Sequence, residues 1–138
     1  MARFLIIEDE MLVALDLEDG IRSLGHDVAG IVPDNKSLAS VDLEHVDAAL
    51  VDLHLRDGVT GPEIGARLAQ RGISVLFITA NPSLLGEGIA GTVGVLTKPT
   101  DREQLSSAVR FLLARRRGMD EPVPQALKLF GSASGNAR

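Results

Sequence analysis

Cysteine, tyrosine and tryptophan are absent from this chain of 138 residues, and phenylalanine occurs only four times. Without cysteine the protein has no disulfide, no thiolate metal site and no thiol nucleophile. Without tyrosine or tryptophan it lacks the rings that would stack on an isoalloxazine, which argues against a flavin protein.

A surplus of positive charge is also missing, because 14 basic residues face 19 acidic ones and the net charge is −5. General nucleic-acid binding needs basic side chains to neutralise phosphates, so we expect no nucleic-acid partner. No apolar run approaches the roughly 20 residues that a membrane-spanning helix needs, and the first residues lack the pattern of a signal peptide. We therefore expect no membrane partner and a cytoplasmic location.

Short apolar runs alternate with segments of helical periodicity, which predicts βα units and a parallel sheet. The length of the chain is typical of one domain with its own core. The expected strands are residues 3–7, 28–32, 47–51, 74–78 and 93–97. The expected helices are residues 10–24, 35–43 (with a weak pattern), 61–70 and a last one from Thr100 to the arginines 115–117.

Right-handed crossovers allow these units to close as an α/β fold, a three-layer αβα sandwich around a five-stranded parallel sheet. The expected strand order is 2-1-3-4-5, which places the first and third strands side by side. In this interpretation residues 1–117 form the domain. Residues 118–138 are predicted to be a flexible C-terminal tail, because they end in small and polar residues. Thr100 and Glu103 are expected to form the capping box of the last helix.

Four of the expected strands are followed directly by residues suited to chemistry. Glu8 and Asp9 follow the first strand, and Asp52 follows the third. Thr79 and Lys98 follow the fourth and the fifth. Parallel strands bring their carboxyl ends to one edge of the sheet, so these side chains should meet there. Three carboxylates, a hydroxyl and an ammonium group suit a divalent cation and a phosphoryl group.

Each of these residues also has a simpler explanation. Glu8 and Asp9 could cap the following helix, and a loop aspartate such as Asp52 is commonly a turn former. Lys98 could only pair with nearby acids, and Thr79 could be present because β-branched residues favour strands. Together, however, three close carboxylates would repel one another without a cation. A hard divalent ion resolves that repulsion, and Mg²⁺ is the ion we expect.

A resemblance to a known family rests on the same strand-end residues. The chain resembles the receiver domain of bacterial two-component response regulators over about residues 2–117, which implies the flavodoxin-like receiver fold. The stretches LIIEDE, VDLHLRDGVTGPEIGARL and LFITANP further resemble stand-alone and stress-response receivers of alphaproteobacteria, often served by kinases of the HWE type. The residues that carry the family signature are Glu8, Asp9, Asp52, Thr79, Lys98 and Pro99.

The resemblance implies a role for each residue of the site. Asp52 would be the phosphoacceptor, while Thr79 and Lys98 would contact the phosphoryl group. His54 and Asn81 would border that group and tune its lifetime. The implied ligands of Mg²⁺ are Glu8, Asp9, Asp52 and the backbone carbonyl of His54.

The function implied is that of a single-domain response regulator in a phosphorelay. It would accept a phosphoryl group from phosphohistidine on a sensor histidine kinase, of the HWE type in the narrower match, or on a histidine phosphotransfer protein. It would not be a turnover enzyme, because it catalyses only its own phosphorylation and dephosphorylation. The tail is too short for a DNA-binding output domain, so we expect the output to be contact with a downstream protein. The arginines 115–117 could also join a homodimer contact.

Two other functions stay open at this point. The chain could be an interaction module that keeps the receiver fold and signals without phosphorylation. It could also be a phosphatase with an aspartyl-phosphate intermediate, in which His54 would serve as the general acid two residues after Asp52.

Two features depart from the family pattern. Val95 stands where the family usually has tyrosine or phenylalanine, so the usual coupled movement of threonine and aromatic ring is not expected. Residues 82–94, where the family has its fourth helix, contain four glycines, and each costs a helix roughly 1 kcal/mol relative to alanine. We predict a short or frayed helix there and a switch that works through local order. Residues 86–91 also match the GxGxxG dinucleotide pattern, but they precede a strand, so nucleotide binding is not expected.

Overall fold

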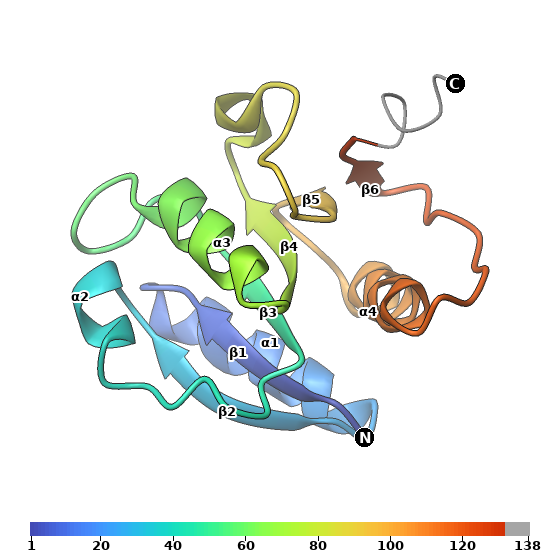
Figure 1. The fold of residues 1–138 in the computed structure, drawn as a ribbon, viewed down its shortest axis with the longest axis horizontal. Helices are drawn as coiled ribbons and strands as arrows, with labels where there is room; N and C mark the ends of the chain where they lie inside the picture. The colour runs from blue at the N-terminus through green and yellow to red at the C-terminus, as the bar shows by residue number, and fades with distance from the viewer. Residues whose placement is uncertain (132–138) are drawn as a thin grey trace.

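The computed structural model describes residues 1–131 and arranges six strands in one sheet (Figure 1). The strands are β1 (Arg3–Ile7), β2 (Asp27–Val32), β3 (Ala48–Val51), β4 (Ser74–Thr79), β5 (Gly94–Thr97) and β6 (Leu127–Leu129). The helices are α1 (Met11–Ser23), α2 (Asn35–Leu38), α3 (Gly61–Gln70), the 3₁₀ helix η1 (Pro82–Leu85) and α4 (Arg102–Arg116).

The sheet has the order β2-β1-β3-β4-β5-β6, and its first five strands are parallel. This topology confirms the predicted α/β fold and the strand order 2-1-3-4-5. All five predicted parallel strands are present, and β6 adds a sixth, antiparallel strand beside β5 that the sequence did not predict.

Apolar side chains cover both faces of the sheet, because successive residues of a strand point to opposite sides. One face packs against α1 and α4, and the other packs against α3, α2 and η1. Neighbours in β4 show the division: Leu76 lies in the core on the α1 and α4 side, and Phe77 lies in the core on the α3 side. The three-layer sandwich is therefore confirmed. Burial on both faces also accounts for the uninterrupted apolar runs of the central strands.

The start of α4 differs from the prediction. Asp101 caps the helix: its Oδ1 accepts a hydrogen bond from the backbone N–H of Gln104 at 2.7 Å. Gln104 Oε1 accepts in return from the backbone N–H of Asp101 at 3.1 Å. The predicted pair, Thr100 and Glu103, lies one residue too early. The hydroxyl of Thr100 instead donates to the carbonyl of Thr97 at 3.3 Å, in the turn that follows β5.

The segment between β4 and β5 begins with the single turn of η1 and continues as a loop. Gly86, Gly88 and Gly91 follow that turn with φ angles of 54°, 116° and 83°. These left-handed values are open to glycine because it has no Cβ, and they interrupt a helix. The short helix predicted within residues 82–94 is therefore confirmed. The weak helix predicted for residues 35–43 is likewise limited to the 4 residues of α2.

Part of the predicted flexible tail belongs to the folded domain. Leu127 and Phe130 are buried, and β6 pairs with β5. Without β6, the edge of β5 would leave backbone N–H and carbonyl groups unpaired, and β6 pairs with them. The sequence did not predict this strand, because three residues are too few to show a strand periodicity. Residues 132–138, the rest of that tail, lie outside the described residues. Within residues 1–131 no helix is long and apolar enough to cross a membrane.

Candidate functional site

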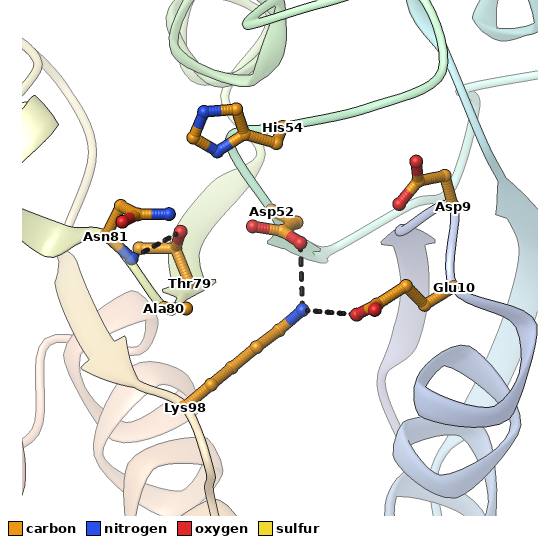
Figure 2. A pocket seen from close by; sticks show the side chains of 8 residues that line it. All are labelled: Asp9, Glu10, Asp52, His54, Thr79, Ala80, Asn81 and Lys98. Atoms are coloured by element: carbon orange, nitrogen blue, oxygen red, sulfur yellow. Dashed lines mark hydrogen bonds and ion pairs between the residues drawn. The ribbon is translucent and has the colours of Figure 1, made fainter.

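The carboxyl ends of the parallel strands border a cleft (Figure 2). Ile7 of β1 is in register with Val51 of β3, and Thr79 of β4 is in register with Thr97 of β5. The loops after these strands therefore begin at the same edge of the sheet. The residues that line the cleft are Asp9, Glu10, Asp52, His54, Thr79, Ala80, Asn81 and Lys98.

An acidic cluster lies where β1 and β3 end. Glu8, Asp9 and Asp52 each offer a carboxylate oxygen, and these oxygens lie within 4.8 Å of one another. Glu8 and Asp52 are buried, with 2% and 7% of their surface exposed, while Asp9 is half-buried. Oxygen donors of this kind and spacing fit a hard divalent cation. The structure thus brings the three predicted carboxylates together in a group that could bind a metal ion.

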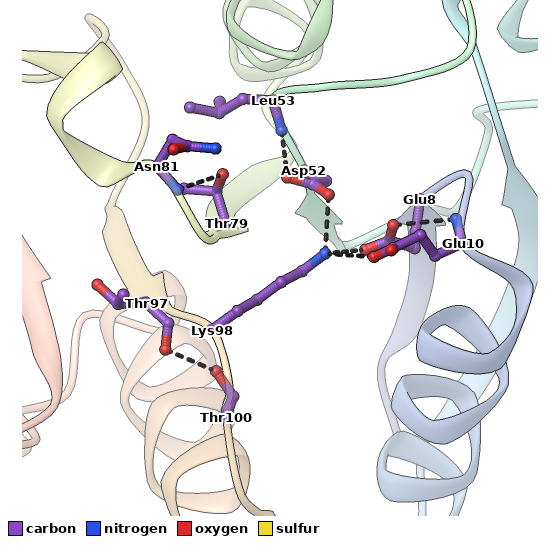
Figure 3. Close-up of polar contacts among 9 residues, drawn as sticks. All are labelled: Glu8, Glu10, Asp52, Leu53, Thr79, Asn81, Thr97, Lys98 and Thr100. Atoms are coloured by element: carbon purple, nitrogen blue, oxygen red, sulfur yellow. Dashed lines mark hydrogen bonds and ion pairs between the residues drawn. The ribbon is translucent and has the colours of Figure 1, made fainter.

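Lys98 lies among the carboxylates and offsets part of their charge (Figure 3). Its Nζ is 2.8 Å from Asp52 Oδ2, 2.9 Å from Glu8 Oε1 and 3.4 Å from Glu10 Oε1. Burial alone would lower the pKa of Lys98, but the hydrogen bonds and charges of Asp52 and Glu8 outweigh burial and raise it. The side chain therefore stays protonated and can offer its positive charge to an incoming anion.

Glu8 is the most buried member of the acidic cluster. Burial raises the pKa of Glu8, and the hydrogen bond from Lys98 lowers it only in part. The backbone N–H of Glu10 also donates to Glu8 Oε2 at 3.1 Å, while the charge of Asp52 acts in the opposite direction and raises the pKa. A second cation would favour the ionised form of Glu8. The electrostatics of the cluster therefore also fit a metal ion.

Asp52 stands between the acidic cluster and the open cleft. One of its carboxylate oxygens pairs with Lys98, and the other accepts a hydrogen bond from the backbone N–H of Leu53 at 2.7 Å. These two contacts fix the orientation of the carboxylate. An oriented carboxylate beside an ammonium group is chemically suited to act as a nucleophile.

Thr79 is fully buried at the end of β4. Its Oγ1 accepts a hydrogen bond from the backbone N–H of Asn81 at 3.1 Å, which holds the hydroxyl at the edge of the sheet. The side chains of His54 and Asn81 line the cleft beside Asp52, as Figure 2 shows. Every side chain predicted for the site therefore lies at this edge. The backbone carbonyl of His54 as a metal ligand stays a prediction.

Glu10 is a residue of the cleft that the sequence analysis missed. Its carboxylate contacts Lys98, which lies 88 positions later in the chain. The sequence did show Glu10 as a third acid directly after Glu8 and Asp9. Acids are common at the start of a helix, however, because they interact favourably with the helix dipole. The pairing with Lys98 could be seen only in the fold.

Val95 is buried on the α3 side of the sheet, in the same apolar core as Phe77 and Phe130. The ring centroids of the two phenylalanines lie 6.3 Å apart. The ring beside Phe77 on this face is therefore that of Phe130, which follows β6. β5 contributes the smaller side chain of Val95.

Known proteins are similar to this sequence over most of its length. The family model of the response regulator receiver domain matches residues 4–110. The phyllosphere-induced regulator PhyR of Methylorubrum extorquens is 38% identical over 123 residues, which are 82% of this chain and 46% of that protein. The transcriptional regulatory protein TcrA of Mycobacterium tuberculosis is 33% identical over 129 residues, 89% of this chain and 48% of that protein. The chain spans about half the length of these curated relatives.

The fold is shared as well. The structure of the response regulator PhyR from Brucella abortus superposes with a TM-score of 0.74 and 32% sequence identity, over 86% of this chain and 50% of that one. The arrangement of the elements therefore matches that of a protein with related sequence.

Proposed function

Because the chain belongs to the response regulator receiver domain family, we propose that Asp52 accepts a phosphoryl group from a phosphohistidine on a partner protein. The observation that carries the proposal is the setting of Asp52, a buried carboxylate within the acidic cluster with one oxygen 2.8 Å from Lys98 Nζ. A module that signals without phosphorylation would need neither the nucleophile nor this charge arrangement. The complete set therefore favours a phosphoacceptor.

In the proposed reaction a carboxylate oxygen of Asp52 attacks phosphorus in line with the bond to the histidine nitrogen. A P–O bond forms, the P–N bond breaks, and the leaving imidazole keeps the electron pair and takes up a proton. Little covalent work falls to the protein, so catalysis is positioning and electrostatic stabilisation. Lys98 Nζ would exchange its contact with Asp52 for a phosphoryl oxygen, and the hydroxyl of Thr79 would donate to another.

Glu8, Asp9 and Asp52 would hold the divalent cation, for which we propose Mg²⁺, with the backbone carbonyl of His54 as a further ligand. When bound, the ion would neutralise charge on the transferring oxygens. The hard oxygen donors of the acidic cluster, which lie within 4.8 Å of one another, support this assignment.

The proposed partners follow from this chemistry. The donor would be a sensor histidine kinase or a histidine phosphotransfer protein in the cytoplasm, and the signal would pass to a downstream protein by contact. The domain would catalyse only its own phosphorylation and the later removal of the group by water. Both events occur at Asp52, so the chain would not turn over a separate substrate as an enzyme does.

The test is incubation with acetyl phosphate and Mg²⁺ followed by intact-mass measurement. Wild type should gain the mass of one phosphoryl group, and Asp52→Asn should gain none. Asp120→Asn, which changes an exposed aspartate in the connection after α4, is the matched control and should behave as wild type. Equal modification of Asp52→Asn and wild type would refute Asp52 as the acceptor.

A further inference from the structure

The last described residues close the edge of the sheet that β5 would otherwise expose (Figure 1). β6 pairs with β5 in antiparallel register, with Leu129 opposite Gly94. The backbone N–H of Phe130 then donates to the carbonyl of Val93 at 2.9 Å. The edge of β5 is therefore a surface that accepts an extended segment.

Side chains of this segment fill both faces of the sheet at its edge. Leu127 is buried in the core on the α1 and α4 side, and Leu129 packs against the same core. Phe130 is buried on the opposite side, near the ring of Phe77. Lys128 is exposed. The surface therefore accommodates an aliphatic residue, an exposed polar residue, a second aliphatic residue and an aromatic residue in succession.

Two glycines leave room for the segment. A Cβ on Gly94 would lie 2.4 Å from the carbonyl oxygen of Lys128, and its three nearest atoms all belong to Leu127 and Lys128. A Cβ on Gly88 would lie 2.6 Å from Cγ of Phe130. Since the closest neighbours of Gly94 are all in β6, the missing side chain at this position serves the strand pairing. The edge is shaped to receive a strand.

The segment is attached to the domain by an exposed connection. β6 is 3 residues long, and residues 118–126, which lead to it from α4, are exposed along most of their length. Pro122 and Pro124 in this connection have no backbone N–H and cannot continue the helix. A short edge strand on such a connection opens at a lower free-energy cost than a central strand. It can therefore be replaced by a competing strand.

We propose that the edge of β5 is a docking surface for an extended segment of a partner protein, with two aliphatic residues at alternate positions followed directly by an aromatic residue. Residues 127–130 occupy this docking surface in the structure, so the partner's strand competes with β6. Residues 127–130 indicate which side chains the partner's strand should carry. In strand addition the backbone hydrogen bonds provide affinity, and the side chains at alternate positions provide specificity.

The docking surface adjoins the cleft through two elements. β5 leads directly into Lys98, and η1 begins a few residues after Thr79. Leu85 of η1 packs in the same core as Phe130. Movement of Thr79 or Lys98 toward a phosphoryl group would shift residues packed around Phe130. This link rests on the proposed function, whereas the docking surface itself does not.

A fluorescein-labelled peptide of residues 123–131 is the probe, and its anisotropy reports binding to the full chain. Phe130→Ala loosens β6, so this variant should bind the peptide at least about tenfold more tightly than wild type. Adding Gly94→Ala should abolish that gain, because the new Cβ meets the carbonyl of the incoming strand. Met119→Ala, at an exposed position of the connection before β6, is the matched control and should bind as wild type does.

Two results would overturn the docking surface: equal binding by wild type and Phe130→Ala, or equal binding by Phe130→Ala and the double variant. Circular dichroism and Mg²⁺ titration establish that each variant is folded. A wild-type dimer that excludes the peptide would also overturn the proposal, since a second copy would then be the occupant.

The link to the cleft has its own measurement. Acetyl phosphate with Mg²⁺ should raise the affinity of wild type for the peptide and leave that of Asp52→Asn unchanged. A mass gain without a rise in affinity would overturn the link alone. The absence of a mass gain would overturn the proposal that Asp52 is the phosphoacceptor. The docking surface would then be tested by the peptide-binding experiment alone.

Discussion

At the scale of single residues, one ammonium group offsets part of the charge of the cleft. Lys98 Nζ contacts the buried carboxylates of Glu8 and Asp52 at 2.9 Å and 2.8 Å. Buried carboxylates are costly without a counter-charge, and Lys98 supplies one positive charge for the two. Asp9 adds a third carboxylate to the acidic cluster. The cluster therefore retains an excess of negative charge that a divalent cation would offset.

Asp9→Asn is expected to weaken Mg²⁺ binding without loss of the metal-free fold. The substitution removes one of three hard anionic ligands. It also relieves repulsion within the acidic cluster, so the metal-free variant should be more stable than wild type by about 1 kcal/mol. Mg²⁺ titration and metal-free melting measure the two effects, with Asp120→Asn as the control. An unchanged titration, or a large fall in the metal-free melting temperature, would contradict the expectation.

At the scale of elements, α2 is tied to the loop after β3. Asp34 caps α2 by accepting from the backbone N–H of Ser37 at 2.7 Å, and it also accepts from Arg56 Nη2 at 2.8 Å. Hydrogen bonds from Ser37, and then from Arg56, lower the pKa of Asp34 to about 2. Arg56 lies two residues after His54, so this ion pair anchors the loop that forms one wall of the cleft.

The contribution of Asp34 to stability should depend on pH. Its pKa in the fold lies below its ordinary value of 3.8, so the ionised carboxylate stabilises the fold above that value. This stability is lost as the pH falls from 3.8 through about 2. Asp34→Asn keeps a capping side chain but removes the charge. Denaturation at a series of pH values should give the largest difference between wild type and variant near neutral pH. A difference that does not shrink in acid would argue against this role.

The segment between β4 and β5 should be less protected from hydrogen exchange than α4. The single turn of η1 and the left-handed glycines after it leave residues 83–92 without a continuous helical ladder. Hydrogen exchange should therefore be faster there than in α4, and it should change when the protein is phosphorylated. Asp52→Asn treated in the same way is the control. The expectation fails if residues 83–92 are as protected as α4, or if the change falls mainly in α1.

At the scale of the whole molecule, the cleft and the proposed docking surface share β5. The strand ends at the cleft, where Lys98 follows it. Its side away from β4 is paired with β6. The sheet therefore joins a charged site at one end to an apolar edge at the side. In the proposed link, changes at the cleft would reach the edge through this one short strand.

Mg²⁺ should stabilise the whole fold, because the acidic cluster is assembled only when β1 and β3 lie side by side. At 100 times its Kd the ion should raise the free energy of unfolding by about 2.7 kcal/mol. Removal with a chelator should return the metal-free value. Melting with and without Mg²⁺ measures the shift, which should be smaller for Asp9→Asn at the same concentration. An equal shift in both proteins would place the ion elsewhere.

The sequence by itself determined the layered fold and the positions of the predicted side chains. Buried strands are local runs of apolar residues. The ends of these strands and the loops that follow bring Asp9, Asp52, Thr79 and Lys98 to one edge whatever the exact packing. Glycines after residue 85 likewise predicted the short η1 from local backbone preference.

Only the tertiary structure decided the contacts between distant segments that do not follow from the order of the parallel strands. The contact of Lys98 with Glu10, the pairing of β6 with β5 and the place of Phe130 beside Phe77 depend on distances between segments far apart in the chain. The choice of Asp101 over Thr100 as the cap of α4 depended on the turn after β5, where Thr97 engages the hydroxyl of Thr100. Local periodicity contains no information about such contacts, because they are selected by the space and the unpaired backbone groups that the folded sheet leaves at its edges.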